Sequence, residues 1–171
     1  PTIAQLSEAI SSHQRGQGLP PIEPSDRTQY PPEPSWAQRR LWFMQQLDLE
    51  DPSYTMPVAL KLSGQVDVDR LERAFKKLIE RHEILRTAYL NCNGEPHVKI
   101  REEVDWSLHR TDISSYDKIN RQVAIDKALH RESHQPFDLE KELLLRAHVI
   151  NVDANSALLL ASIHHLIADA W

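Results

Sequence analysis

Apolar residues recur every three or four positions in four separate stretches of the chain, which is the spacing of amphipathic helices. The first stretch lies at the N-terminus, with Thr2 as its N-cap and an apolar face of Ile3, Leu6 and Ile10. The second begins after the N-cap Ser35 and reads SWAQRRLWFMQQLDL. Its predicted buried stripe is Trp36, Leu41, Met44 and Leu47, and its predicted polar part is Gln38, Arg39, Arg40 and Gln45.

The third and fourth helical patterns lie in the middle of the chain. The third begins at Asp67 or Asp69 and should stop near His82. Its predicted inward face is Val68, Leu71, Phe75, Leu78 and Ile79. The fourth covers residues 117–134 and ends before Pro136, because proline cannot continue a helix. Its predicted inward residues are Ile119, Val123 and Leu129.

A period of two, or a short apolar run, marks the predicted strands. MPVALKLSG alternates apolar and polar positions, and the turn residues NCNG separate ILRTAYL from EPHVKIRE as in a β-hairpin. The apolar runs LLLRAHVINV and ALLLASI flank the tight turn VDANS. Strands and helices are interleaved, so we predict an α/β or α+β fold whose sheet is at least partly antiparallel.

Residues 12–34 separate the first helix from the rest of the chain. The segment RGQGLPPIEPSDRTQYPPEPS holds six of the eleven prolines and two of the four glycines. Such a composition excludes helix and central strand and predicts a partly extended linker. The first helix, within residues 1–11, therefore belongs to a different domain from the folded part, 35–171.

Composition narrows the class of protein. The chain has 171 residues, of which 40% are apolar and 26% charged, as in ordinary globular domains. A net charge of -5 does not favour nucleic acid or an anionic membrane as partner. The single cysteine, Cys92, excludes an internal disulfide and suits a reducing compartment. With no stretch long enough to span a membrane and no leader pattern, we expect a cytoplasmic protein.

The candidate chemistry lies in the last residues, IHHLIADAW, directly after an apolar strand. Successive side chains of a strand point to opposite faces, so His164 and His165 should not reach one ion together. This geometry counts against a metal site and favours a single working imidazole, the group best suited to proton transfer near neutral pH. A buried structural pair of histidines is the equally open alternative.

Three separated strings resemble, in order, the first three core motifs of condensation domains from nonribosomal peptide synthetases. They are SWAQRRLWFMQQL, RHEILRTAYL and IHHLIADAW, against the approximate motifs SxAQxRLWxL, RHExLRTxF and HHxxxDG. The resemblance spans about residues 30–171. The opening PTIAQLSEAI resembles more weakly the last helix of a peptidyl carrier domain.

The resemblance implies a chloramphenicol acetyltransferase-like lobe with a mixed sheet and flanking helices. It implies peptide-bond formation, by transfer of an acyl group from an upstream carrier thioester to the amine of a downstream aminoacyl carrier. His165 matches the residue of the reaction centre. His164 should make structural hydrogen bonds, and Asp169 should pair with Arg40 as an architectural clamp. Arg81 and Arg86 of the second motif should organise the lobe behind the histidines.

The resemblance also implies partners. The expected ones are upstream and downstream carrier domains, an adenylation domain and the C-terminal lobe of the condensation domain, which this sequence lacks. Substrates would arrive on phosphopantetheine arms, with no cofactor or metal bound directly. We expect the 171-residue piece alone to be inactive, and Ala170 replaces the glycine of the motif.

Alternatives from the same and from another class stay open. One is an epimerisation-type or free acyltransferase domain of the same fold. The other is a non-catalytic docking or interaction fragment.

Overall fold

The computed structural model of the protein describes residues 2–12, 21 and 23–169. The chain divides into two compact units, Pro1–Pro32 and Glu33–Trp171. In the first unit, helix α1 spans Ile3–Ser12, and Thr2 caps it with a reciprocal pair of hydrogen bonds. The predicted N-terminal helix and its cap are thus confirmed. Most of the predicted linker's first half lies outside the described residues.

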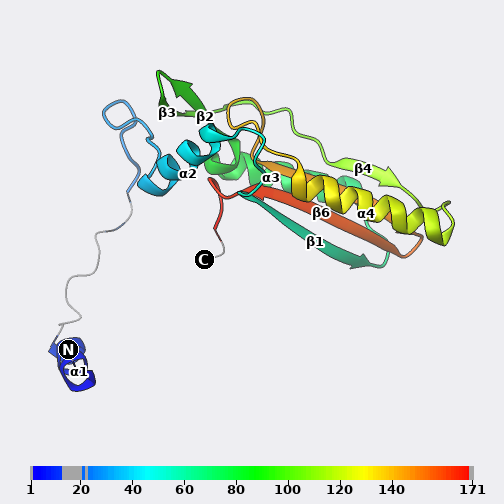
Figure 1. The fold of residues 1–171 in the computed structure, drawn as a ribbon, viewed down its shortest axis with the longest axis horizontal. Coiled ribbons are helices and arrows are strands. Elements are labelled where there is room, and N and C mark those ends of the chain that lie inside the picture. The colour runs from blue at the N-terminus through cyan, green and yellow to red at the C-terminus, as the bar shows by residue number, and fades with distance from the viewer. Residues whose placement is uncertain (1, 13–20, 22, 170–171) are drawn as a thin grey trace. The chain divides into compact units, whose positions relative to one another are not determined.

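A four-stranded mixed sheet organises the second unit (Figure 1). Its order is β1-β6-β5-β4, in which β6 pairs antiparallel with both β1 and β5, and β4 pairs parallel with β5. The strands are β1 Thr55–Ser63, β4 His109–Asp112, β5 Leu145–Asp153 and β6 Ser156–His164. The predicted pairing of the two apolar runs is confirmed by β5 and β6. Strand β4 occupies a stretch whose sequence pattern is ambiguous.

Two helices cover the opposite faces of this sheet. Helix α3, Val68–Arg81, packs Phe75 and Ile79 against Leu159 of β6. Helix α4, Lys118–His134, packs against the next residue of the strand, Leu160, in a separate cluster. Because neighbouring residues of a strand point to opposite faces, the two helices lie on different sides. Apolar side chains on both faces of β6 explain why its sequence reads as a continuous apolar run.

Helix α2 and the hairpin form a smaller core beside the end of β6. Helix α2 spans Trp36–Leu47, and a 3-10 turn η1, Glu83–Arg86, leads into strands β2, Thr87–Cys92, and β3, Glu95–Ile100. The hairpin turn places Asn93 at φ 57° and Gly94 at φ 87°, a conformation that Asn-Gly adopts readily. The core here consists of Trp42, Tyr89, Phe137, Leu139, Leu144, Leu166 and Ile167.

Of the four residues predicted for the buried stripe of α2, Leu41 packs against the core as predicted, whereas Trp36, Met44 and Leu47 are exposed. Trp36 is 89% exposed and Leu47 66% exposed, whereas Trp42 is 3% and Gln45 only 2% exposed. The helix turns its Gln38–Trp42–Gln45 side toward the core. Gln45 can be buried because its amide nitrogen donates to the carbonyls of the following turn, 3.0 Å from that of Asp51. Periodicity alone could not reveal this compensation.

The predicted inward face of α4 is also wrong. Ile119 and Val123 are exposed, and Leu129 is partly so, while Ala124, Ile125 and Ala128 pack toward the sheet. Small alanine side chains let the helix lie close to the strands. Glu132 is buried near the end of the helix, where its backbone carbonyl accepts a hydrogen bond from the Ser162 hydroxyl at 2.9 Å. Leu78 of α3, predicted inward, is likewise exposed.

Candidate active site

The two adjacent histidines lie where β6 ends. His164 is the last residue of the strand and is paired with Thr55 of β1, while its amide donates to the Leu144 carbonyl at 3.0 Å. The amide of His165 donates to the Tyr54 carbonyl at 2.9 Å, one position beyond the paired strands. The backbone of both residues is therefore held by neighbouring segments before the chain turns.

His164 is buried, with only 1% of its surface exposed. Its Nδ1 atom accepts a hydrogen bond from the Leu166 amide at 3.1 Å, which leaves Nε2 as the protonated nitrogen facing Gln45 Oε1 at 3.4 Å. The Phe137 ring meets the imidazole edge-on. Burial first, and then the neighbouring charge of His165, lowers the pKa of His164 to about 4. His164 is thus a neutral packing residue near pH 7.

His165 is half-buried and has the opposite hydrogen-bond pattern. Its Nδ1 lies 2.9 Å from the Ala168 carbonyl oxygen. Because a carbonyl only accepts, Nδ1 carries the proton and Nε2 keeps its lone pair when the ring is neutral. Across residues 2–12, 21 and 23–169, no hydrogen-bond partner is found for Nε2. This nitrogen has the form that a proton acceptor requires.

A cavity of about 600 Å³ adjoins His165. It is lined by His165, Tyr54, Arg40 and Asp169, together with Ala37, Gln38 and Leu41 of α2 and Leu166 and Ala168 of the histidine turn. Arg40 and Asp169 are both exposed and come from segments more than a hundred residues apart in the chain. The fold thus brings three of the sequence-predicted site residues to one space.

Arg81 and Arg86 do not line that cavity. Arg86 donates to the Arg101 carbonyl at 2.6 Å and lies 3.5 Å from Glu83, so it ties η1 to the end of β3. Arg81 is exposed in the last turn of α3, where a cation favours the helix C-terminus. Neither arginine thus lies in the space beside His165.

Sequence analysis does not identify two glutamines and a tyrosine that lie near the histidines as site residues. Gln38, whose side chain caps α2 together with Ser35, also donates to the Leu166 carbonyl at 3.0 Å and to the Tyr89 hydroxyl at 2.9 Å. Gln45 faces His164. The S-x-x-Q capping signature identifies the helix start but gives no sign of these long-range contacts.

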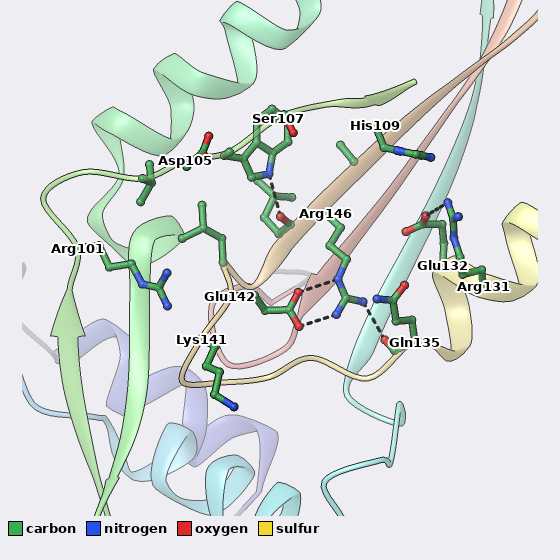
Figure 2. Close-up of a pocket in the computed structure, with 15 residues that line it drawn as sticks. Arg101, Asp105, Ser107, His109, Arg131, Glu132, Gln135, Lys141, Glu142 and Arg146 are labelled. Carbon is green, nitrogen blue, oxygen red and sulfur yellow. Dashed lines mark hydrogen bonds and ion pairs between the residues drawn. The ribbon is translucent and has the colours of Figure 1, made fainter. Parts of the chain in front are cut away.

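A second polar pocket of about 500 Å³ lies between β5, the end of α4 and the two loops before β4 and β5 (Figure 2). Arg146 dominates it: the guanidinium binds Glu142 at 2.7 and 2.9 Å and donates to two backbone carbonyls, including that of Pro136 at 2.6 Å. It also stacks 3.9 Å above the Phe137 ring. Arg146 of β5 thus holds the loop that precedes this strand, so the pocket is a structural junction.

Beside this pocket, both ring nitrogens of His148 have hydrogen-bond partners. His148, 3% exposed, accepts at Nδ1 from Arg131 at 3.0 Å and donates from Nε2 to the Thr111 hydroxyl at 2.9 Å. Glu132 lies 3.7 Å from the His148 ring.

Within the described residues, no group of three or more His, Cys, Asp or Glu is arranged to hold a metal ion. No helix among them is long and apolar enough to cross a membrane.

The family model of condensation domains matches residues 28–171, and the chain belongs to this family. Among curated proteins, it is 37% identical over 169 residues to bacitracin synthase 3 of Bacillus licheniformis. It is 40% identical over 138 residues to chondramide synthase of Chondromyces crocatus. These alignments cover 99% and 80% of this chain but only 2% and 4% of the relatives.

Solved structures agree with the fold. The starter condensation domain of rhizomide synthetase superposes with a TM-score of 0.72 at 21% identity. The first condensation domain of the calcium-dependent antibiotic synthetase does so with a TM-score of 0.71 at 21% identity. Each superposition covers 81% of this chain and 33% of the solved one, so the chain spans about a third of those structures. The predicted mixed α/β, chloramphenicol acetyltransferase-like lobe is confirmed.

Proposed function

We propose that this chain is the N-terminal lobe of a condensation domain that forms peptide bonds in nonribosomal peptide synthesis. The amine of a downstream carrier-bound aminoacyl group would attack the thioester of an upstream acyl or peptidyl carrier. The carbon–nitrogen bond forms, the carbon–sulfur bond breaks, and the upstream thiol is released. The observation that carries the proposal is the state of His165: Nδ1 donates to Ala168 while Nε2 keeps a lone pair beside an open cavity.

Nε2 of His165 suits the proton chemistry of this reaction. A neutral imidazole can accept a proton from the attacking ammonium, or hold the amine through a hydrogen bond while the tetrahedral intermediate forms. The proton passes finally to the departing thiolate. General acid–base catalysis contributes typically about 10²–10⁴-fold to a rate.

Arg40 and Asp169 are proposed as an ion pair that supports this arrangement. Both line the cavity beside His165, one from α2 and the other from the segment after the histidine turn. A guanidinium–carboxylate pair with two parallel hydrogen bonds fixes a loop more rigidly than a lysine pair would. Asp169 is followed by Ala170, which lies outside the described residues. His164, Arg81 and Arg86 are assigned supporting rather than chemical roles.

The proposed partners follow from the same reaction. They are an upstream and a downstream peptidyl carrier domain, with substrates on phosphopantetheine arms, an adenylation domain, and the C-terminal lobe of the condensation domain. Helix α1 is proposed as the tail of the upstream carrier, joined through the linker 12–34 to the lobe 35–171. A cytoplasmic location remains a prediction.

The test compares three proteins with loaded donor and acceptor carriers, using mass spectrometry to detect the dipeptidyl carrier. They are the 171-residue chain, a complete condensation domain that contains it, and that domain with His165→Ala. We expect product from the complete domain alone, because orientation of two reactants contributes about 7–11 kcal/mol and needs both walls of the site. Unchanged carrier binding by the variant serves as control.

Two results would contradict the proposal. Undiminished turnover by the His165→Ala domain would remove the role of the imidazole. Carrier binding without product from the complete domain would instead favour a docking module.

A further inference from the structure

The carbonyl of Leu166 is held by two donors from distant parts of the chain. Gln38 Nε2 of α2 donates to it at 3.0 Å, and the Tyr89 hydroxyl of β2 lies 3.4 Å from it. Gln38 Nε2 also donates to the Tyr89 oxygen at 2.9 Å. The three groups close a small hydrogen-bonded triangle, which we call the Leu166 clasp.

The orientation of the Gln38 amide is determined by the helix cap. Its Oε1 accepts from the Ser35 amide at 2.8 Å, in the capping box of α2. The nitrogen must therefore face the other way, and its two protons match the two acceptors in the clasp. Tyr89 is fully buried, and burial raises its pKa to about 12, so its hydroxyl stays protonated and able to donate.

Leu166 sits inside the turn that determines the protonation of His165. The turn runs from His165 to Ala168, whose carbonyl accepts the Nδ1 proton of His165 at 2.9 Å. At its start, the Leu166 amide donates to His164. With its amide and its carbonyl both held, Leu166 fixes the path of the chain toward Ala168. The position of the Ala168 carbonyl, and so the tautomer of His165, depends on that path.

We propose that Gln38 and Tyr89 are positioning residues for His165, which act by clasping the Leu166 carbonyl. The inference rests on the proposed role of His165. Gln38 also lines the cavity beside His165, but the proposed effect of both residues requires no contact with substrate. Their effect is to keep the proton on Nδ1 and the lone pair on Nε2, because a loosened turn withdraws the Ala168 carbonyl and frees the ring to exchange tautomers.

Gln38→Glu tests the clasp with little disturbance of the helix. Glutamate preserves the capping box, since its carboxylate still accepts from Ser35, but it presents an acceptor instead of a donor to Leu166. Tyr89→Phe removes only the hydroxyl. The matched control is Gln46→Glu on the same helix, where the side-chain oxygen accepts a hydrogen bond from Asn91 at 3.3 Å.

The readout is the tautomer of His165 in the 171-residue chain, measured by NMR with ¹⁵N-labelled histidine above pH 7. The His165→Gln variant assigns the signals. We expect the Nδ1–H form to dominate in the wild type, and its ratio to the Nε2–H form to fall about fivefold in Gln38→Glu, as for the loss of one hydrogen bond. Tyr89→Phe should shift the ratio less, and Gln46→Glu should leave it unchanged.

Turnover of a complete condensation domain gives a second readout. Gln38→Glu should lower kcat on the order of 10–100-fold with KM for the carriers unchanged within about twofold, because misplacing a reacting group by about 1 Å can cost 100-fold. Thermal unfolding shows that each variant is folded. A tautomer ratio equal to wild type in both clasp variants would overturn the proposal, even if their unfolding temperatures fall. The tautomer measurement does not depend on activity, so a failure of the proposed function is seen separately.

Discussion

His164 and His165 are adjacent in the chain and opposite in chemical state. His164 accepts at Nδ1 from the Leu166 amide and carries its proton on Nε2. His165 carries its proton on Nδ1, which donates to the Ala168 carbonyl. One backbone turn supplies both an N–H and a C=O, and each selects a different tautomer. Local backbone groups, rather than the imidazole itself, therefore decide which nitrogen is available.

Solvent access separates the two residues further. His164 is enclosed by Phe137, Tyr54 and Gln45, so protonation is unfavourable. His165 borders a cavity that also holds Arg40 and Asp169. A buried imidazole with both nitrogens bonded stabilises the fold, as His148 does elsewhere. An imidazole with one nitrogen bonded and the other beside a cavity is suited to chemistry.

The largest expected contrast is in stability. His164→Ala should lower the free energy of unfolding by about 3–5 kcal/mol, because it opens a cavity and leaves the Leu166 amide without its acceptor. His165→Ala should cost less than about 1.5 kcal/mol, since it removes one hydrogen bond from a half-buried ring. Urea denaturation measures both. Equal losses would erase the distinction between the two histidines.

Acid should reveal the burial of His164 as a loss of stability. Its pKa is lowered from 6.5 to about 4 in the folded chain. Between these values, the unfolded chain takes up the proton and the folded chain does not, so stability falls as pH decreases from about 6.5 to 4. The loss amounts to at most about 3 kcal/mol. His164→Gln should lack this component when urea midpoints are compared at pH 7 and pH 4. An equal fall of the urea midpoint between pH 7 and pH 4 in wild type and variant would contradict this prediction.

Gln45→Leu should weaken the enclosure of His164. The change removes the acceptor for Nε2 and the donor to the carbonyls of the turn after α2, with an expected loss of about 2 kcal/mol in unfolding free energy. Its neighbour Gln46 provides the control: Gln46→Leu should change the free energy by less than about 0.5 kcal/mol. Chemical denaturation of both variants measures the two losses. Similar losses for Gln45→Leu and Gln46→Leu would contradict a specific role of the buried Gln45 amide.

The smallest effects are expected on the outer face of α2. Trp36→Ser and Leu47→Ser should each change the unfolding free energy by no more than about 0.5 kcal/mol, because both side chains are largely exposed. Trp42→Ser in the same helix should be strongly destabilising. A loss above about 2 kcal/mol for Trp36→Ser, measured by urea denaturation, would instead support burial of the Trp36 face.

Local signals in the sequence predict the elements well. Ser35 and Asp67 cap their helices as expected, and Asn93-Gly94 closes the predicted hairpin. These features depend on contacts within a few residues, so the chain's local pattern contains the necessary information. The three motifs likewise identify the family through their residues and order alone.

Hydrophobic periodicity does not correctly predict which faces of α2 and α4 point inward. In α2, a buried Gln45 replaces the expected Met44 and Leu47, and in α4 the small Ala124 and Ala128 replace Ile119 and Val123. Which side of a helix is covered depends on the surface that it meets, and that surface comes from residues far away in the chain. A polar side chain can face the core when distant or backbone groups complete its hydrogen bonds.

For the candidate site, the sequence already predicts that His164 and His165 follow a buried strand and differ in environment, because strand geometry alternates side chains. How they differ depends on the packing of distant segments. The Leu166 amide, the Ala168 carbonyl, Gln38 and Tyr89 meet there because α2, β2 and the histidine turn pack together. Hydrogen-bond partners more than fifty residues apart leave no periodic trace in a sequence, and here they hold the turn whose own amide and carbonyl select the two tautomers.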